Sequence, residues 1–490
     1  MFRLKPFAVV VLAGVLRLSA GLWLGFRPFD DSYITFRYAL NLASGLGFVY
    51  NVGEHVLGTT TPLWAMVLAV LQKAHLPIET SALVLPLCLD MVTAILLFQL
   101  LVRLRYDATV AAGAAVVFLS WFDYFSIARS GMEAPLFVFL AVGAIYAMVS
   151  RRLLPAAVCC GLACLTRPEG ALLGALLIFV LWRSRAAVRR ADLLGAIAVF
   201  VALCGGWALY ANHTFGSIIP QSVVAKAAMA RQPDLIRFSW TNLALFFVKG
   251  QYGGDVFTRT YLQLMPVVTL LSAVAAGTIA LAAWRALGGV RPQADDEQWR
   301  AVTLLVFPAC YVTGLAVGHA FTYFPWYYAP IYPFAAALSA IGAGVVWRGR
   351  KGLMAGTCAA LVAAQLAAAV LVKLPADRDF WVKGYSSVSE GVPRQTEVTV
   401  AAPEIGAVGW RVWPATVLDL EGLVTPSAVG RDPEEYVREK RPQYVILRTD
   451  NAREFLERAD GDAWFLGEYE VMASTRDPYA NREFRAYRRK

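Results

Sequence analysis

Two adjacent carboxylates, Asp30 and Asp31, directly follow the first strongly apolar run of the chain. Adjacent side chains point in different directions, so one carboxylate can act as a general base while its neighbour orients a backbone group or a cation. Like charge and partial burial both raise a carboxylate pKa, which helps the group to accept a proton near neutral pH. The structural alternative is that both residues stabilise the following helical segment through the helix dipole.

A second set of candidates consists of cations in the loops and turns between apolar runs, with Arg129 and Arg167 in tight turns. Arg129 lies four residues before Glu133, Arg167 lies two residues before Glu169, and Lys226 has no acid within a helical turn. Arginine binds phosphate with two parallel hydrogen bonds and lysine supplies a point charge, so donor-phosphate binding is one interpretation. Local pairing of each arginine with its neighbouring glutamate is the other. Further cations of this kind are Arg37, Arg231, Arg237 and Arg259.

Weaker candidates are residues that could contact a substrate. His55 could reach a phosphate or a hydroxyl, although the four histidines show no metal-ligand spacing. Tyr327 belongs to an aromatic run, 323–328, that is typical of a membrane interface, with stacking on a sugar ring as the sharper interpretation. The remaining candidate substrate contacts come from the motifs around the stronger candidates: Tyr33, Glu133, Glu169 and Gln221.

Composition indicates which elements must position these residues. The chain has 490 residues, of which 58% are hydrophobic and only 16% charged, with a mean hydropathy of +0.53. These values exclude an ordinary soluble enzyme and a disordered chain. The net charge is +10, but residues 375–490 carry 20 acids against 17 bases, so the excess lies in the apolar part. Lysine and arginine between apolar runs orient a multi-pass membrane protein, and no nucleic-acid motif accompanies them.

The apolar runs predict about eleven transmembrane helices. With the N-terminus in the cytoplasm, most arginine-rich loops fall inside and the chain leaves the last span outside. An additional short run, 61–71, begins at a Thr-Pro pair and is predicted to be an interfacial helix. The expected spans are 7–26, 80–102, 108–126, 134–150, 153–167, 169–182, 192–212, 261–284, 301–321, 328–347 and 353–374.

The domain organisation follows from this topology. Residues 1–374 are expected to form a transmembrane catalytic domain, which includes a long first outward loop, 27–79. Residues 375–490 are expected to form a small extracytoplasmic α/β domain. Its predicted strands are 397–401, 416–420, 443–448 and 465–472, and Asp432-Pro433-Glu434-Glu435 begins a helix.

The segment from Asp30 to Trp64 resembles the first extracytoplasmic loop of the C-type glycosyltransferases (GT-C), and most closely that of the mycobacterial terminal arabinofuranosyltransferase group and its bacterial relatives. The shared features are an Asp-Asp-x-Tyr-Ile-x-Phe-Arg-Tyr opening, an Asn-x-Gly-Glu turn and a Gly-x-Thr-x-Pro-Leu-Trp close. Later landmarks are Ser-Gly-Met-Glu at 130–133, Arg-Pro-Glu-Gly at 167–170, Pro-Gln-Ser-x-x-Ala-Lys at 220–226, and the tail segments 404–406 and 418–423. The chain departs from the resemblance at Thr59, where an aromatic residue is expected after the glycine.

The resemblance implies an inverting glycosyltransferase of the bacterial inner membrane. It would transfer a sugar, such as arabinofuranose, from a polyprenyl-phosphate donor to a glycan, lipid or protein acceptor on the periplasmic side. An aspartate, Asp30 slightly ahead of Asp31, would deprotonate the acceptor hydroxyl, and an outward cation would neutralise the leaving phosphate. A divalent cation (Mg²⁺, Mn²⁺ or Ca²⁺) fits beside two carboxylates, but this mechanism requires no metal.

Two other classes of function remain open on the sequence alone. A transporter or flippase of lipid-linked or small solutes would also be a multi-pass protein, but it predicts internal symmetry and broken helices, which we do not detect. An accessory membrane protein with a glycan-binding tail is the third interpretation. Transfer from a panel of lipid-phosphate sugars separates these classes.

Overall fold

The structure is a computed structural model, and it describes residues 4–184, 188–229, 304, 306–317, 325–368, 380–448, 463–478 and 482–490. The chain divides into two compact units, which we describe separately. We call them the helical unit (1–27, 82–207 and 233–375) and the loop–tail unit (28–81, 208–232 and 376–490).

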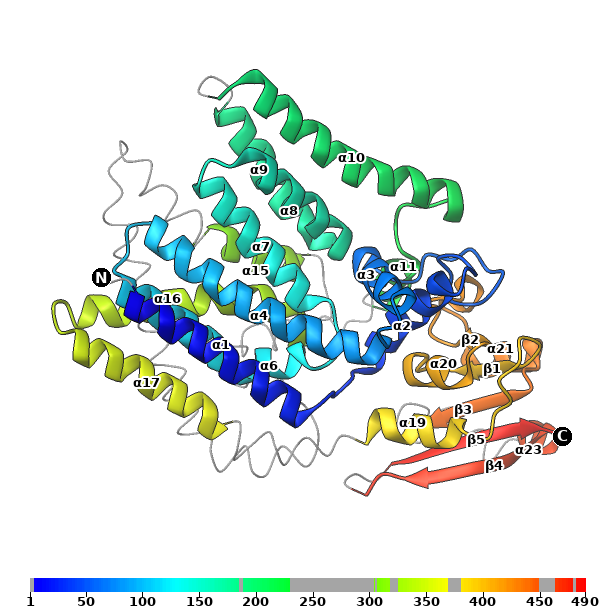
Figure 1. The fold of residues 1–490 in the computed structure, drawn as a ribbon. Helices are drawn as coiled ribbons and strands as arrows, with labels where there is room; N and C mark the ends of the chain where they lie inside the picture. Colours follow the sequence, from blue (N-terminus) through cyan, green and yellow to red (C-terminus); the bar gives the residue numbers. More distant parts are fainter. Residues whose placement is uncertain are drawn as a thin grey trace. The chain divides into compact units, whose positions relative to one another are not determined.

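The helical unit is built from long apolar helices (Figure 1). Helix α5 packs against α1, α16 and α17, while α8 lies between α7 and α9. Helices approach closely where a glycine lies at the contact: a Cβ on Gly161 would be only 2.7 Å from a methyl group of Leu203. The helices are α1 (Leu4–Leu24), α4 (Ile78–Arg103), α5 (Ala108–Ser120), α6 (Phe122–Ala128), α7 (Ala134–Val149), α8 (Leu153–Thr166), α9 (Ala171–Ser184), α10 (Arg190–Phe215), α15 (Phe307–Val317), α16 (Tyr332–Val346) and α17 (Lys351–Ala368).

The multi-pass α-helical prediction is confirmed at the level of the fold. Within the described residues, four helices are long and apolar enough to cross a membrane, or five if the bent pair α5 and α6 forms one span. The break between α5 and α6 bends the chain by 61°. Several other expected spans are shorter apolar helices, and the span 261–284 lies outside the described residues, so the count of eleven stays a prediction.

A buried ion pair fixes α1 inside the helical unit. Arg17 donates from Nε and Nη2 to Asp90 Oδ2 on α4, at 2.8 and 2.6 Å. Its guanidinium also donates to the carbonyl of Leu119 on α5. Both charged side chains are nearly inaccessible, so each needs the other as a partner in this apolar environment. The pair therefore holds α1 to two neighbouring helices.

The loop–tail unit contains a five-stranded mixed sheet with strand order β2-β1-β3-β5-β4. Strands β1, β2 and β3 are parallel, with Val400 of β1 opposite Val417 of β2, whereas β5 runs antiparallel to β3 and β4. The elements are α2 (Asp30–Ala43), α3 (Pro62–Lys73), α11 (Gln221–Met229), α19 (Trp381–Ser389), β1 (Thr399–Ala402), α20 (Gly406–Val412), β2 (Thr416–Asp419), α21 (Pro433–Lys440), β3 (Tyr444–Arg448), α23 (Ala463–Glu468), β4 (Tyr469–Arg476) and β5 (Glu483–Arg489).

The sequence predicted most of this sheet. The runs 397–401, 416–420 and 443–448 correspond to β1, β2 and β3, and the run 465–472 begins as α23 before it continues as β4. Asp432 caps α21 as expected, because its Oδ1 accepts the N–H groups of Glu434 and Glu435 at 2.9 and 3.2 Å. Strand β5 was not predicted, because its arginines give it the composition of a charged chain end.

The first outward loop belongs to the same compact unit as the tail. Loop 28–81 groups with residues 376–490 and not with the apolar helices, whereas the predicted domains, 1–374 and 375–490, stay a prediction. Asn51 shows why: its amide donates to Val417 O and accepts from Val417 N, both at 2.9 Å, as a neighbouring strand residue would. The loop thus extends the free edge of β2.

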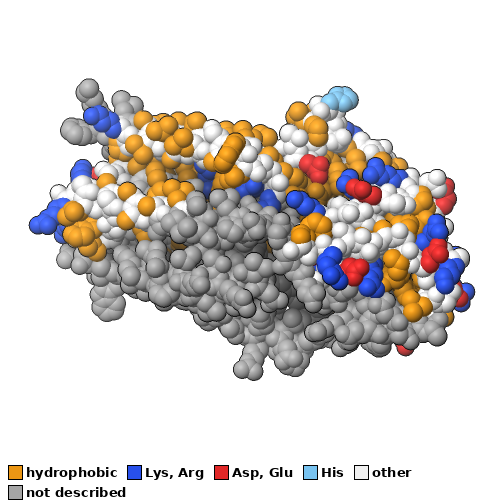
Figure 2. Space-filling model, turned by 90° about the horizontal axis from the view of Figure 1, so that it is seen from below, with side chains coloured by type: hydrophobic (Ala, Val, Ile, Leu, Met, Phe, Trp, Pro, Cys, Tyr) orange, Lys and Arg blue, Asp and Glu red, His pale blue; other side chains and the backbone are white. Residues whose placement is uncertain are grey.

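The two units also differ in surface chemistry. Figure 2 shows mainly hydrophobic side chains on the drawn part of the apolar helices, and interspersed acidic and basic side chains on the sheet. Examples are the half-exposed Leu12 and Phe179 in the helical unit, against the surface ion pair of Arg488 with Glu470 in the sheet. Contact with lipid is consistent with the first surface and contact with water with the second.

Candidate functional site

The predicted aspartate pair lies in the first turn of α2, where the two side chains have different surroundings. Asp30 accepts the backbone N–H groups of Gly406 and Ala407, each at 2.8 Å, and so caps the N-terminus of α20. Burial and the neighbouring charge of Asp31 raise the pKa of Asp30 to about 6, although the two backbone hydrogen bonds oppose this shift. Gly406 is required here, because a Cβ would overlap the main-chain carbonyl of Asp30. Both oxygens of Asp30 thus serve the fold.

Asp31 faces Lys226 of α11. The shortest distance between its carboxylate and the lysine Nζ is 3.9 Å, and the two side chains remain 28% and 29% exposed. Helix α11 is held in place by Gln221, whose main-chain N–H donates to Leu57 O at 2.6 Å and whose side chain donates to Gly422 O at 3.1 Å. The structure therefore brings together Asp31 of the first loop with Gln221 and Lys226 of the 220–226 motif.

Two further carboxylates accompany this group. Glu404 follows β1 and Glu421 follows β2, so both lie at the carboxyl edge of the parallel strands, the usual position of ligand sites in α/β sheets. Burial raises the pKa of Glu421 to about 8, with Asp419 and Asp31 adding to the shift and Lys226 opposing it. Burial, with the charge of Asp30, also raises the pKa of Glu404. The sequence marked both segments but assigned neither residue a role, although a carboxylate directly after a parallel strand is a usable signal.

Arg37 has a structural role, which corrects its assignment as a phosphate ligand. Its side chain is fully buried and donates to the carbonyls of Tyr50, Gly409 and Ala415, at 2.8, 2.6 and 2.5 Å. It also donates to Asn51 Oδ1 at 3.2 Å. These contacts use the guanidinium to join the loop to the tail, and they leave no approach for a phosphate.

Arg129, in the helical unit, is likewise a structural cap. Its Nε and Nη2 donate to the carbonyls of Gly25 and Leu24, at 2.8 and 3.0 Å, and its side chain is almost inaccessible. A cation at the last carbonyls of α1 satisfies backbone acceptors and interacts favourably with the helix dipole. This placement replaces the donor-phosphate assignment of Arg129.

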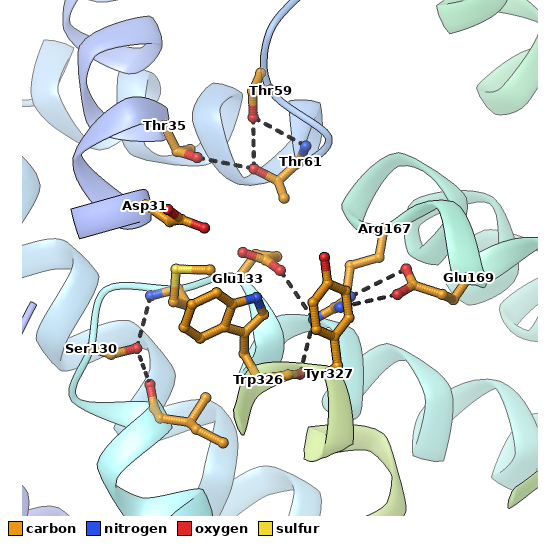
Figure 3. A network of polar contacts seen from close by, with 12 residues as sticks. Asp31, Thr35, Thr59, Thr61, Ser130, Glu133, Arg167, Glu169, Trp326 and Tyr327 are labelled. Atoms are coloured by element: carbon orange, nitrogen blue, oxygen red, sulfur yellow. Dashed lines mark hydrogen bonds and ion pairs between the residues drawn. The ribbon is translucent and has the colours of Figure 1, made fainter. Parts of the chain in front are cut away.

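Arg167 is saturated by protein partners in the helical unit, as Figure 3 shows. It binds both oxygens of Glu169, at 3.3 and 3.0 Å, and lies 3.2 Å from Glu133. Its third partner is the carbonyl of Trp326, at 3.1 Å, and the ring of Tyr327 lies 5.2 Å from the guanidinium carbon. One cation thus faces two carboxylates, so this cluster does not provide a free positive charge for a phosphate. Its pairing with Glu169 confirms the local interpretation.

The two other predicted substrate contacts are placed differently from one another. Tyr33 is buried and donates to Glu79 at 2.8 Å, and burial, reinforced by that carboxylate, raises its pKa above the ordinary tyrosine value. His55 is exposed on the loop. Neither side chain has a recorded contact with Asp31 or Lys226. Among the described residues, no three His, Cys, Asp or Glu side chains could hold a metal ion together.

Two solved structures identify the fold. The chain is similar to the crystal structure of the Archaeoglobus fulgidus oligosaccharyltransferase in complex with Zn and sulfate, with 14% identity and a TM-score of 0.58 over 94% of this chain and 71% of that one. It is also similar to ArnT from Cupriavidus metallidurans bound to undecaprenyl phosphate, with 13% identity and a TM-score of 0.55 over 98% and 97% of the two chains. The chain has the C-type glycosyltransferase fold. The resemblance seen in the sequence is thereby confirmed.

One sequence relative and one family match add to this result. The terminal beta-(1->2)-arabinofuranosyltransferase of Mycobacterium tuberculosis is 27% identical over 339 residues, which cover 64% of this chain and 50% of that protein. The match thus spans half the length of this curated relative. A family described as "Domain of unknown function (DUF8728)" matches residues 383–487, which is most of the tail.

Proposed function

We propose that this GT-C protein is an inverting glycosyltransferase that uses a polyprenyl-phosphate-linked sugar. The observation that carries the proposal is the pairing of a partly exposed carboxylate with a partly exposed ammonium group, Asp31 and Lys226, at the carboxyl edge of the tail sheet. A base and a phosphate-binding cation are the two charges that this reaction needs. The fold supports the proposal because ArnT, which shares it, binds undecaprenyl phosphate.

In this mechanism Asp31 accepts the proton of an acceptor hydroxyl. The hydroxyl oxygen forms a bond to the anomeric carbon of the donor sugar, and the bond from that carbon to the phosphate oxygen breaks. Polyprenyl phosphate leaves with the electron pair, and Lys226 offsets the negative charge that develops. A single displacement inverts the anomeric centre. Asp31 takes the role that the resemblance gives first to Asp30, because both oxygens of Asp30 already accept backbone hydrogen bonds.

The remaining details of the proposal come from the sequence and the relatives. Charge distribution favours a cytoplasmic N-terminus and an outward-facing tail, and the bacterial relatives favour the inner membrane, which makes the tail periplasmic. The arabinofuranosyltransferase relative makes arabinofuranose the first donor sugar to test, with a cell-envelope glycan, lipid or protein as acceptor. The substrate roles of Glu133, Glu169 and Tyr327, which contact Arg167 in the helical unit, stay predictions from the sequence.

The test is sugar transfer by the purified full-length protein in vesicles. Synthetic polyprenyl-phosphate sugars, beginning with arabinofuranose and continuing through common hexoses, are offered with a glycan acceptor. We expect transfer with inversion from at least one donor. Movement of the labelled lipid across the vesicle, without transfer from any donor, would overturn the enzyme proposal in favour of a flippase.

A further inference from the structure

Three threonine hydroxyls form a buried chain on the face of α2 that carries Asp31. Thr35 Oγ1 lies 3.2 Å from Thr61 Oγ1, and Thr59 Oγ1 lies 3.0 Å from the same atom. The backbone N–H of Thr61 also donates to Thr59 Oγ1, at 3.1 Å. All three residues are at least nine-tenths buried, with exposed fractions of 7%, 4% and 5% for Thr35, Thr59 and Thr61. Figure 3 shows this chain together with the Asp31 carboxylate.

Among the described residues, the three hydroxyls have more hydrogens than acceptors. Three hydroxyl groups supply three hydrogens, but the two oxygen–oxygen contacts use only two of them. One donor is left over in every arrangement, and the described residues offer it no further partner. Buried hydroxyls normally find a partner, so the leftover hydrogen indicates a polar ligand atom.

The geometry of Thr61 also argues against a purely local role. Thr61 occupies the N-cap position of α3, where a threonine usually accepts a hydrogen bond from the first turn. Its side chain makes no such bond and contacts Thr35 and Thr59 instead. The sequence therefore places a capping residue here, but its hydroxyl serves the chain.

Thr35 is one helical turn after Asp31, so the two side chains lie on the same face of α2. Residues at this spacing have Cβ atoms about 5–6 Å apart. At that separation, two neighbouring hydroxyls of one sugar ring can bind at the same time, one to the carboxylate of Asp31 and the other to the hydroxyl of Thr35. A sugar hydroxyl can both donate and accept, which matches a chain whose hydrogens can reorient.

We propose that Thr35, Thr59 and Thr61 form a hydroxyl-recognition subsite for the acceptor sugar. The inference rests on the proposed function, because it assumes that Asp31 activates the acceptor. The subsite binds the hydroxyl next to the one that attacks and so selects among acceptors. It includes Thr59, the position at which this chain departs from the resemblance.

The experiment is a cycle that changes both protein and substrate. Thr35→Val removes one hydroxyl at nearly constant shape, and a series of deoxy acceptors removes one substrate hydroxyl at a time. We expect wild-type kcat/KM to fall about 10- to 100-fold for the one deoxy acceptor that lacks the recognised hydroxyl. That hydroxyl can make one or two hydrogen bonds, and the loss of each lowers kcat/KM by about tenfold. Thr35→Val should show the same loss on the intact acceptor and almost no further loss on that deoxy acceptor.

Three variants control this cycle. Thr60→Val alters the neighbouring threonine, which is outside the chain of hydroxyls, and should transfer like wild type. Thr35→Ser keeps the hydroxyl and should retain the sensitivity to the deoxy acceptor. If Thr35→Val does not fold, as judged by thermal unfolding, Thr59→Val at the other end of the chain gives the same cycle.

The outcomes separate this inference from the proposed function. If the loss caused by Thr35→Val and the loss caused by the deoxy acceptor multiply when both are combined, the two changes act independently. The threonines then have a structural role, and this inference alone is overturned. Coupling to deoxy donors instead of deoxy acceptors would overturn the acceptor assignment. Wild-type protein that transfers no sugar from any donor would overturn the proposed function and this inference with it.

Discussion

Arg167 and Lys226 were both predicted to bind the donor phosphate, but the two cations differ in their ion pairs. Arg167 lies in a turn of the helical unit, and Lys226 lies on α11 opposite Asp31 of α2. Arg167 contacts two carboxylates and a carbonyl within 3.3 Å, and its side chain is 4% exposed. The ion pair of Lys226 with Asp31 is longer, at 3.9 Å, and the lysine side chain is 29% exposed. A cation on the outer side of an apolar protein is therefore only a candidate for a ligand; its protein partners decide whether it can serve one.

The same lesson applies within one turn of helix. Asp30 and Asp31 are neighbours in sequence, but successive helical residues are about 100° apart around the axis, so they meet different surroundings. Asp30 faces the backbone of α20, and Asp31 faces the ammonium group of Lys226.

The largest effect is expected for Asp31→Asn. If Asp31 is the general base, kcat/KM for sugar transfer should fall about 10²- to 10⁴-fold, because the amide cannot accept the proton. The thermal unfolding midpoint should stay near that of wild type, since the carboxylate is partly exposed.

Asp30→Asn is the matched comparison for this variant. An amide can accept only one of the two backbone hydrogen bonds from Gly406 and Ala407, so stability should fall by about 1–3 kcal/mol. The folded fraction should still transfer sugar. The opposite pattern, with transfer lost in folded Asp30→Asn and kept in Asp31→Asn, would return the base to Asp30.

Arg167→Met should mainly affect stability. Removing the cation leaves Glu133 and Glu169 without their common partner, and breaking a buried ion pair in this way costs about 3–5 kcal/mol. Thermal unfolding in detergent measures the loss. Arg167→Met combined with Glu133→Gln and Glu169→Gln removes all three charges and should recover much of it. If the single variant is as stable as wild type but binds donor weakly, Arg167 is a phosphate ligand after all.

Lys226→Ala should do the reverse. Loss of one phosphate-stabilising contact typically costs about 10²- to 10³-fold in turnover, and we expect an effect at the lower end because the ammonium group is partly solvated. Stability should change little. Lys226→Arg keeps the charge and should retain most of the transfer, so equal losses in the two variants would contradict an electrostatic role.

The sequence predicted the parts of this structure that depend on local patterns. Apolar runs located the helices, and Asp432 with its following proline located the start of α21. The pairing of Arg167 with Glu169, two residues away, was also accessible. In each case the structure can be predicted from residues that are close together in the sequence.

The contacts that decide the site are not of this kind. Arg37 donates to Gly409, which is 372 residues away, and Asp30 caps a helix 376 residues away. Spacing along one sequence carries no information on such pairs, so it could neither separate Asp30 from Asp31 nor remove Arg37 from the phosphate candidates. The hydroxyl chain of Thr35, Thr59 and Thr61 was missed because threonines near a Thr-Pro pair are typical of helix starts.

The smallest expected effect concerns the pH dependence of transfer. Glu421 has a pKa raised to about 8 from an ordinary value of 4.5, so it is mostly protonated at neutral pH and ionises above pH 8. The new negative charge opposes phosphate binding at Lys226, and wild-type kcat/KM for the donor should therefore fall several-fold above pH 8. The free energy of unfolding should also fall with rising pH. The raised pKa of Glu421 means that the folded state favours the protonated carboxyl, and this contribution to stability is lost as pH rises from about 4.5 to 8.

Glu421→Gln keeps the uncharged state at all pH values and should remove the decline above pH 8. Glu439→Gln makes the same chemical change on the exposed face of α21, where ion pairs with Lys440 and Arg431 lower the glutamate pKa, and it should leave the profile as in wild type. A decline that persists in Glu421→Gln would assign the titration to another group. A pH profile that becomes flat in Glu421→Gln but not in Glu439→Gln would assign the decline to Glu421. The charge pair of Asp31 and Lys226 then has a neutral carboxyl group as its neighbour, whereas Arg167 faces two carboxylates.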